Sequence, residues 1–400
     1  AYNTGIAFRY LLPDTSVYGD YTITDEQTRF SLTTKGVALC HENGQQQIAK
    51  KHKIKNLPKE TKIHPPLTAE FDSGTALTLT VSKLDNYAYP LLNKNSRGLL
   101  KPIEQEVKVT ENGPTASPYW TFVIGDSLAD LPENKDIILN LNDAPDEEQY
   151  RFRQWVKPGK ALMLGLFSET TESMKLYVDT AKQCGLDYLI LDFGWYGPEF
   201  DERSDPRLDP DQLTPDSDDS AEIAEAKAFM RNYVTENGVF NASNKPFNVY
   251  ENCPWGGDIQ MSPNISIPEI VKYAKSQGIG IFLYVNDVQL NDRLNRYDLD
   301  ELFEQFSNWG VVGVKPGFVP DKSQENEEST RNIIETAAKY KLMLTVHDEW
   351  IQTGIERTYP NLLSAEGVLG DEGLTEKDIK GDINSLFARG VQGFTDHTFC

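Results

Sequence analysis

The feature that most constrains the fold is a repeated alternation, from about residue 161 onward, of unbroken apolar segments with amphipathic ones. The apolar segments are Ala161–Phe167, Tyr188–Phe193, Ile279–Val285, Val311–Val314 and Leu342–Val346, and helical patterns cover Ser173–Cys184, Asp298–Asn308 and Glu328–Tyr340. Continuous apolar strands that alternate with amphipathic helices indicate a parallel sheet with both faces covered. No glycine-rich phosphate loop follows any strand, so the pattern favours a (β/α)8-type barrel over a doubly wound sheet.

The predicted barrel is incomplete at its C-terminus. We count about seven candidate strands, of which the last lies near Val391–Thr395, and the sequence ends at Cys400.

Residues 1–148 have a different pattern, which predicts an N-terminal β-sandwich. Short alternating or β-branched runs lie at Tyr21–Leu32, Ala76–Leu84, Glu106–Thr110 and Tyr119–Gly125, with turn residues between them. Runs of this kind are typical of antiparallel strands. The polar, turn-forming stretch Asn142–Glu148 marks the boundary, so the barrel domain is expected to cover residues 149–400.

A long insertion interrupts the barrel at about residues 197–263. Its first part is crowded with Asp and Pro, and a helix is expected over Ala221–Thr235. The insertion follows the strand that ends near Asp192, so it is predicted to lie over the mouth of the barrel. A long loop inside a compact domain usually has a function, and we interpret this one as a substrate-side rim, with a plain surface insertion as the alternative.

The composition excludes several classes of partner. The chain has 61 Asp and Glu against 39 Lys and Arg, which gives a formal net charge of −22. Because a surface this acidic repels phosphate backbones and anionic lipid, we expect neither nucleic acid binding nor membrane insertion. No apolar run approaches the roughly 18 residues of a membrane span. The four cysteines form no CxxC pair, and the first residues lack the layout of a signal peptide.

Polar residues that follow the predicted strands are the candidates for chemistry, because barrel enzymes carry their active sites at the C-terminal ends of the strands. These residues are Asp192 with Trp195, Asn286 with Asp287, Lys315, His347 with Asp348 and Glu349, Glu366 and Glu372 around a short apolar run, and Asp396 with His397. Most of these strand ends supply a carboxylate, which is a stronger signal than any single residue.

Converging carboxylates suit two chemistries. One is glycoside hydrolysis, in which one carboxylic acid protonates the leaving oxygen and a second carboxylate acts as base or nucleophile. The other is a Ca²⁺ site, because this hard cation prefers oxygen ligands. Aromatic residues near the strand ends, such as Trp195 and Tyr284, suit stacking on a sugar, and packing at a strand end is the alternative for each.

Each candidate also has a structural alternative. Asp192 could brace the barrel rim, and Asp287 could hydrogen-bond to the following loop. His347 is expected to orient a neighbour, because no Ser or Cys nucleophile lies in a suitable context. If the strand continues, Asp348 and Glu349 point in opposite directions, and we favour Asp348.

The segment His347–Asn361 continues into Leu362–Glu372, and the two together resemble the signature of glycoside hydrolase family 97, the bacterial α-glucosidases and α-galactosidases. Trp155–Lys160, Leu191–Tyr196 and Trp309–Lys315 support the resemblance, which covers most of the chain from Gly5 onward. It implies an N-terminal β-sandwich, a catalytic barrel and a C-terminal β-domain, so that this chain is a fragment lacking both ends. It also implies a periplasmic or secreted location and an oligosaccharide or glycoside substrate.

The resemblance further implies roles for individual residues. Glu372 matches the general acid, and Asp348 takes the place of a glutamate that ligates calcium and serves as base, with Asp287 as the nearest match to a second base. Calcium would be held by Asp348, Glu366 and Glu372. Residues expected to contact the substrate are Asp192, Trp195, Lys315, His347 and Asp396.

Two departures from the family pattern shape the expected activity. Retaining members carry an aspartate nucleophile where this chain has Gly317, which resembles the inverting members, so an inverting α-glycosidase is predicted. The sandwich glutamate that reaches calcium falls on Val81. A carbohydrate-binding homologue that has lost turnover is the alternative from another class, and a barrel enzyme that forms a Schiff base on Lys315 is a third hypothesis.

Overall fold

The computed structural model describes residues 2–32, 35–59, 61–95, 97–165, 170–197, 199, 201–232, 265–290, 298–320, 322–370 and 379–398. The chain forms two compact units. The first unit comprises residues 1–149, 319–332 and 345–400, and the second comprises residues 150–318 and 333–344. About half of the predicted insertion, mainly residues 233–263, lies outside the described part of the chain.

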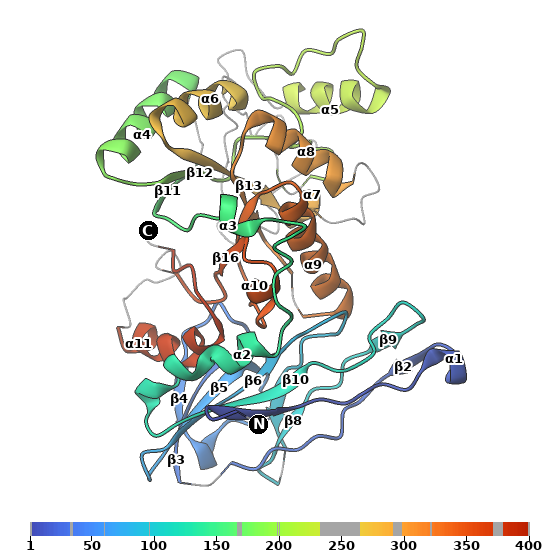
Figure 1. Ribbon diagram of the computed structural model, residues 1–400, viewed down its shortest axis with the longest axis vertical. Coiled ribbons are helices and arrows are strands. Elements are labelled where there is room, and N and C mark those ends of the chain that lie inside the picture. The colour runs from blue at the N-terminus through green and yellow to red at the C-terminus, as the bar shows by residue number, and fades with distance from the viewer. Residues whose placement is uncertain are drawn as a thin grey trace. The chain divides into compact units, whose positions relative to one another are not determined.

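The first unit is built on an antiparallel sheet of eight strands (Figure 1). Six of them run in the order β1 (Gly5–Phe8), β10 (Tyr119–Gly125), β6 (Ala76–Ser82), β5 (Ile63–Phe71), β3 (Gly36–Glu42) and β4 (Lys50–Lys53), while β7 (Leu92–Lys94) pairs with β5 and with β8 (Leu100–Pro102). A separate two-stranded ribbon joins β2 (Tyr21–Ile23) to β9 (Val107–Val109). This arrangement confirms that the N-terminal part is a β-domain, and its description as a sandwich stays a prediction.

The alternation along β6 explains why the sheet buries both of its faces. One set of side chains, which includes Leu79 and Val81, packs into an apolar core with Leu67 and Trp120. The intervening residues are threonines, and the hydroxyls of Thr78 and Thr68 lie 2.7 Å apart. Buried hydroxyls need hydrogen-bond partners, so this second face packs on a polar surface.

The C-terminal segment of the first unit covers that threonine face. The Thr68 hydroxyl donates to the carbonyl of Phe387 at 2.7 Å, at the end of α11 (Ile379–Ala388). The Gln392 amide donates to the Val81 carbonyl at 2.9 Å. Residues more than 300 positions apart therefore form one interior through hydrogen bonds as well as apolar contact.

The second unit carries parallel strands with helices between them. The sheet order is β11 (Ala161–Leu164), β12 (Tyr188–Leu191), β13 (Gly280–Asn286), β14 (Gly313–Gly317), β15 (Met343–Val346) and β16 (Leu362–Ala365), with the last part of β15 and all of β16 belonging to the first unit. The main helices are α4 (Thr171–Gln183), α5 (Ala221–Asn232), α6 (Ile267–Gln277), α8 (Leu299–Trp309) and α9 (Gln324–Lys339), of which α9 belongs to the first unit up to residue 332. The register pairs Leu191 with Leu283, and Tyr284 with Lys315, so the C-terminal ends of neighbouring strands lie side by side.

The remaining elements are short. They are the helices α1 (Thr15–Tyr18), α2 (Asp136–Asn140), α3 (Phe152–Trp155), α7 (Asp287–Leu290) and α10 (Ile355–Thr358), and 3-10 turns at Ile54–Asn56, Leu128–Asp130, Glu133–Lys135 and Gly390–Gln392.

One predicted strand is wrong. Val391–Thr395 begins in a 3-10 turn, and within it only Thr395 makes a parallel bridge, to Ala365. The neighbouring strand is β16, which ends at Ala365. It therefore lies before the apolar run Gly367–Gly370 that Glu366 and Glu372 flank. Leu362 and Ala365 are the buried residues of β16, and an amphipathic strand of four residues is hard to distinguish from a turn in sequence. The described parallel strands therefore form a partial barrel.

Among the described residues, no helix is long and apolar enough to span a membrane.

Two neutral histidines lie in the interior of the β-sheet. His41 of β3 and His64 of β5 are paired in register, and their exposed fractions are 1% and 6%. Burial lowers the pKa of His41 to about 4 and that of His64 to about 3, and the positive charge of Lys322 also contributes at His64. The His41 ring Nδ1 lies 2.6 Å from the Gln45 carbonyl oxygen, which suits donation from the neutral ring.

We expect the first unit to lose stability as the pH falls from about 6.5 towards 4. The unfolded chain binds protons on these histidines before the folded chain does, because both folded-state pKa values are depressed, so acid favours unfolding. His64→Gln should make the melting temperature less dependent on pH in that window. Calorimetric melts of the variant and the parent across the window test this, and equal slopes would contradict it.

Candidate active site

A buried ion pair joins two strand ends of the second unit. Asp192 directly follows β12 and Lys315 lies on β14; the Lys315 Nζ and an Asp192 carboxylate oxygen are 2.5 Å apart. The two side chains are only 5–6% exposed. A charged pair so deeply buried must be stabilised by its own geometry. The pair also engages the Lys315 nitrogen with a carboxylate. This argues against the Schiff-base hypothesis, since formation of a Schiff base requires a free amine.

Aromatic side chains of neighbouring segments surround this ion pair. The Lys315 Nζ lies 5.7 Å from the centre of the Tyr284 ring. The Tyr284 carbonyl accepts a 2.7 Å hydrogen bond from the indole N–H of Trp195, whose side chain is fully buried. A buried indole cannot stack on a sugar, so Trp195 is a packing residue and its predicted contact with substrate is corrected. Trp195 therefore fits the alternative interpretation given in the sequence analysis, packing at a strand end.

Glu199 is a further carboxyl group of this cluster that sequence reasoning missed. It is 1% exposed, and one of its oxygens accepts a 2.5 Å hydrogen bond from the backbone N–H of Gly194. Burial raises the pKa of Glu199 well above its usual value, and the negative charge of Asp192 raises it further. A signal existed, because Glu199 lies only seven positions after Asp192 in the loop that leaves the strand end.

Three aspartates of the acidic stretch after Glu199 are buried, namely Asp201, Asp205 and Asp209. Asp201 bonds Arg203 at 2.8 Å, and Asp205, with no exposed surface, bonds Arg207 at 2.7 Å. Asp209 accepts a 3.0 Å hydrogen bond from the backbone N–H of Ile267 in the first turn of α6. Each buried carboxylate has a donor, which is the condition for burying it.

Asn286 and Asp287 occupy the end of β13 as predicted. The Asn286 side-chain oxygen accepts from the Val288 N–H at 3.0 Å and so caps the short helix α7. Asp287 is the first residue of that helix and is 8% exposed. A role as second base stays a prediction for this residue.

The first unit contains a second group of predicted residues, centred on His347. Its Nε2 lies 2.7 Å from an Asp396 oxygen and its Nδ1 lies 3.4 Å from a Glu366 oxygen. The imidazole is 6% exposed, whereas the Asp396 side chain is 36% exposed. The structure therefore brings three predicted residues together, and a ring held between two carboxylates orients them, as expected for His347.

Glu366 follows β16 and is 1% exposed. One of its carboxylate oxygens accepts 2.8 Å hydrogen bonds from the Asp348 backbone N–H and from the Gln46 amide. The other lies 3.3 Å from the Thr398 hydroxyl. Gln46 comes from the turn between β3 and β4, and no sequence signal could have found it because it is one of three consecutive glutamines.

Asp348 and Glu349 have separate roles. The Glu349 carboxylate accepts hydrogen bonds from the backbone N–H groups of Gln45 and Gln46, so it holds the turn that presents the Gln46 amide. The preference for Asp348 over Glu349 as a reacting group stays a prediction. β15 ends at Val346, and Asp348 has a φ of 74°, so strand alternation does not apply. Non-glycine residues with such a φ often lie at functional sites.

The residue that matches the position of a nucleophile has no room for a side chain. A Cβ atom at Gly317 would collide with the ring of Tyr284. Gly317 ends β14 directly beside Asn286 of β13, so the strand end there presents backbone and the Tyr284 ring to its surroundings.

The residues described here do not by themselves fit a calcium ion. No group of three His, Cys, Asp or Glu side chains suited to a metal occurs among them, and the Glu366 carboxylate already accepts hydrogen bonds from three protein donors. Val81, at the place of a calcium-ligating glutamate, is fully buried in the apolar core. Glu372, predicted both as general acid and as calcium ligand, lies outside the described residues. We therefore derive no step through calcium.

Comparisons with known proteins identify the class of protein to which this chain is similar, the glycoside hydrolases. The family "Glycosyl-hydrolase 97 N-terminal" matches residues 1–144, and "Glycoside hydrolase 97" matches residues 256–368. The chain belongs to glycoside hydrolase family 97, which confirms the resemblance.

Its relatives are longer proteins. A probable retaining α-galactosidase of Streptomyces bingchenggensis is 25% identical over 98% of this chain and 53% of its own length. A retaining α-galactosidase of Bacteroides thetaiotaomicron is 23% identical over 100% of this chain and 58% of its own. A family 97 enzyme from Pseudoalteromonas sp. strain K8, solved in complex with panose, has a TM-score of 0.74 at 22% identity and matches 99% of this chain and 59% of its own. The chain thus spans a little over half the length of these relatives.

We expect the Asp192–Lys315 pair to be essential for the stability of the second unit. Asp192→Ala leaves a buried ammonium without its partner, which lowers the free energy of unfolding by about 3–5 kcal/mol. The double variant Asp192→Ala/Lys315→Met removes both charges and should lose far less. Urea unfolding followed by circular dichroism measures both values.

A matched control is the exposed pair Lys175–Glu269, 2.6 Å apart, where Glu269→Ala should have a much smaller effect because water solvates both charges. Equal losses for the single and the double variants of the buried pair would contradict the prediction.

Proposed function

We propose that this chain carries the catalytic core of a glycoside hydrolase that cleaves α-linked galactosides or glucosides. The observation that carries the proposal is the arrangement in the first unit of His347 and Glu366, which directly follow β15 and β16, with Asp396. Membership of family 97 and the names of the two curated relatives support the substrate class.

In this proposal Asp396 contacts the substrate. Its carboxylate is the most exposed of the three, at 36% of its side chain. One oxygen is oriented by His347 at 2.7 Å and by the Thr345 hydroxyl at 3.1 Å, and a carboxylate held in this way can accept from a sugar hydroxyl. His347 is a positioning residue, since its ring is buried between Asp396 and Glu366.

The chemical step is assigned to a pair of carboxyl groups. We propose that Glu372 protonates the glycosidic oxygen and that Asp348 assists water as a base, with Asp287 as a second candidate for the base. Two carboxyl groups with these roles must have different pKa values, with the acid raised and the base low. The support for Asp348 is its place directly after His347 and its hydrogen bond from the backbone N–H to Glu366.

Asp396→Asn should lower kcat/KM for p-nitrophenyl α-galactoside or α-glucoside about 10- to 100-fold, because a hydrogen bond to a charged acceptor is lost. The exposed Asp126 of the same unit supplies a control, and Asp126→Asn should leave the rate unchanged. Initial rates of hydrolysis of the p-nitrophenyl α- and β-galactosides and α- and β-glucosides, with and without a calcium chelator, measure this. Calcium stays a prediction, which unchanged rates in chelator would contradict.

The catalytically impaired carbohydrate-binding homologue is a second candidate, favoured by the Tyr284 ring that blocks any side chain at residue 317. The same assay separates the two. Binding of the sugar in calorimetry with no hydrolysis of any activated glycoside at high protein concentration would support binding alone and overturn the hydrolase.

The stereochemical course is a distinct question on which two findings point in opposite directions. Both curated relatives are named retaining enzymes, which speaks against the inverting prediction. In this chain, however, β14 ends in Gly317 and none of its five residues is a carboxylic acid. The inverting course stays a prediction that rests on Gly317.

Proton NMR of freshly released sugar decides the course. If Gly317 denies the enzyme a nucleophile, the first product of an α-glycoside should be the β-anomer, because water attacks from the opposite face. An α-anomer as first product would show retention and would require a nucleophile elsewhere in the chain.

A further inference from the structure

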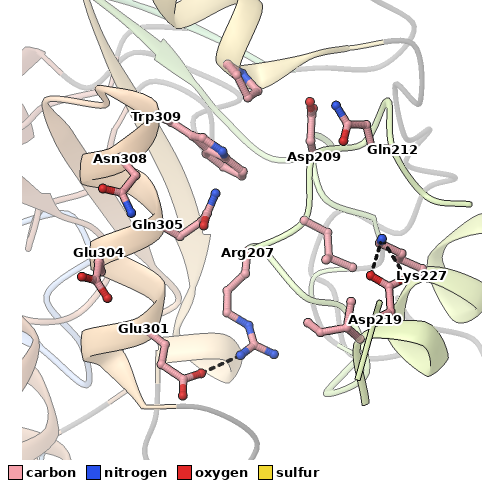
Figure 2. A pocket seen from close by; sticks show the side chains of 13 residues that line it. Arg207, Asp209, Gln212, Asp219, Lys227, Glu301, Glu304, Gln305, Asn308 and Trp309 are labelled. Atoms are coloured by element: carbon pink, nitrogen blue, oxygen red, sulfur yellow. Dashed lines mark hydrogen bonds and ion pairs between the residues drawn. The ribbon is translucent and has the colours of Figure 1, made fainter. Parts of the chain in front are cut away.

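We infer that the second unit carries a separate, non-catalytic site for a neutral sugar, in a pocket between α8 and the loop 207–212. The pocket has a volume of about 550 Å³, which lies within the range of about 300–1,000 Å³ that is usual for small-molecule sites. Figure 2 shows Gln305 and Trp309 of α8 pointing into the space that faces Asp209 and Gln212.

The pocket is on the side of α8 that faces away from the sheet. Leu299, Leu302, Phe303 and Phe306 form the buried stripe of this helix. The pocket is lined instead by the stripe Glu301, Glu304, Gln305 and Asn308, followed by Trp309. Positions three and four apart share one helix face, so these residues project away from the strands that carry Asp192 and Lys315. The pocket is therefore separate from the strand-end cluster of the second unit.

The two cations of the pocket already have partners. Arg207 contacts carboxylates of Asp205, Glu222 and Glu301 at 2.7–2.8 Å. Lys227 bonds Asp219 at 2.8 Å. With both cations neutralised and acidic residues in excess, an anionic ligand is disfavoured.

The groups that remain for a ligand are amides and an indole. Within the part of the chain that the structure describes, the side chains of Gln212, Gln305 and Asn308 and the Trp309 N–H form no hydrogen bond. An amide both donates and accepts, as a sugar hydroxyl does, and a half-buried indole offers an apolar face beside a polar N–H. This combination of amides and an indole suits a neutral sugar.

Binding of a sugar in this pocket can be observed through Trp309, because the side chain of Trp309 lines the pocket. Its ring stacks on Phe306, with centroids 5.9 Å apart, so its position is set by the helix core. Incorporation of 5-fluorotryptophan gives a fluorine NMR signal for each of the six tryptophans, and Trp309→Phe assigns the signal of Trp309 by its loss.

The experiment titrates methyl α-D-galactopyranoside and methyl α-D-glucopyranoside into the labelled protein. The Trp309 signal should shift saturably, and Gln305→Ala should weaken the apparent affinity on the order of ten-fold, the effect of losing one strong hydrogen bond. Ser307→Ala is the control, since Ser307 is exposed on α8 and is not among the pocket residues. Hydrolysis of an aryl glycoside should be the same in Gln305→Ala as in the parent.

Three outcomes would overturn the inference. They are a Trp309 signal that does not move up to the solubility limit of either sugar, an equal loss of affinity in Ser307→Ala, and a shift produced by choline but not by sugar. The inference does not depend on the proposed hydrolysis. In a protein without turnover, sugar binding would still shift the Trp309 signal. An active enzyme whose Trp309 signal does not shift would contradict only the proposed sugar site.

Discussion

A buried carboxylate remains stable only where hydrogen-bond donors surround it, and this requirement explains the architecture of both units. In the second unit, Lys315 of β14 neutralises Asp192 at the end of β12. In the first unit, Glu366 accepts from the Asp348 backbone, from the Gln46 amide and from Thr398, beside the His347 ring. Each arrangement joins distant segments of the chain, because no single loop supplies enough donors.

The same requirement gives neighbouring carboxyl groups different surroundings. Glu199 lies close to Asp192 and has a backbone N–H as its hydrogen-bond donor, and its pKa is raised by burial and by that neighbouring charge. Asp192, in contrast, is paired with the Lys315 side chain. The two carboxyl groups of this cluster therefore differ in their partners, a backbone N–H for Glu199 and a side-chain nitrogen for Asp192.

Some local structures exist only to hold these groups. Glu349 fixes the turn that carries Gln46, and Asn286 caps the helix that begins at Asp287. In α8 the two faces have different roles, since one packs into the interior and the other lines the pocket that contains Trp309. The chain thus combines a strand-end cluster with a separate pocket on a helix, and one helix contributes to both the core and the surface without conflict.

The sequence by itself determined the strand–helix alternation after residue 161, the positions of Asp192 and His347 directly after their strands, and the family. These follow from local periodicity and short motifs, which neighbouring residues specify. Only the tertiary structure decided that Trp195 is fully buried, that Glu199 is part of the Asp192 cluster, that Gln46 donates to Glu366, and that Val391–Thr395 is not a strand. Burial and hydrogen-bond partnership are set by segments hundreds of positions apart, and no local pattern records which distant residue will supply the donor.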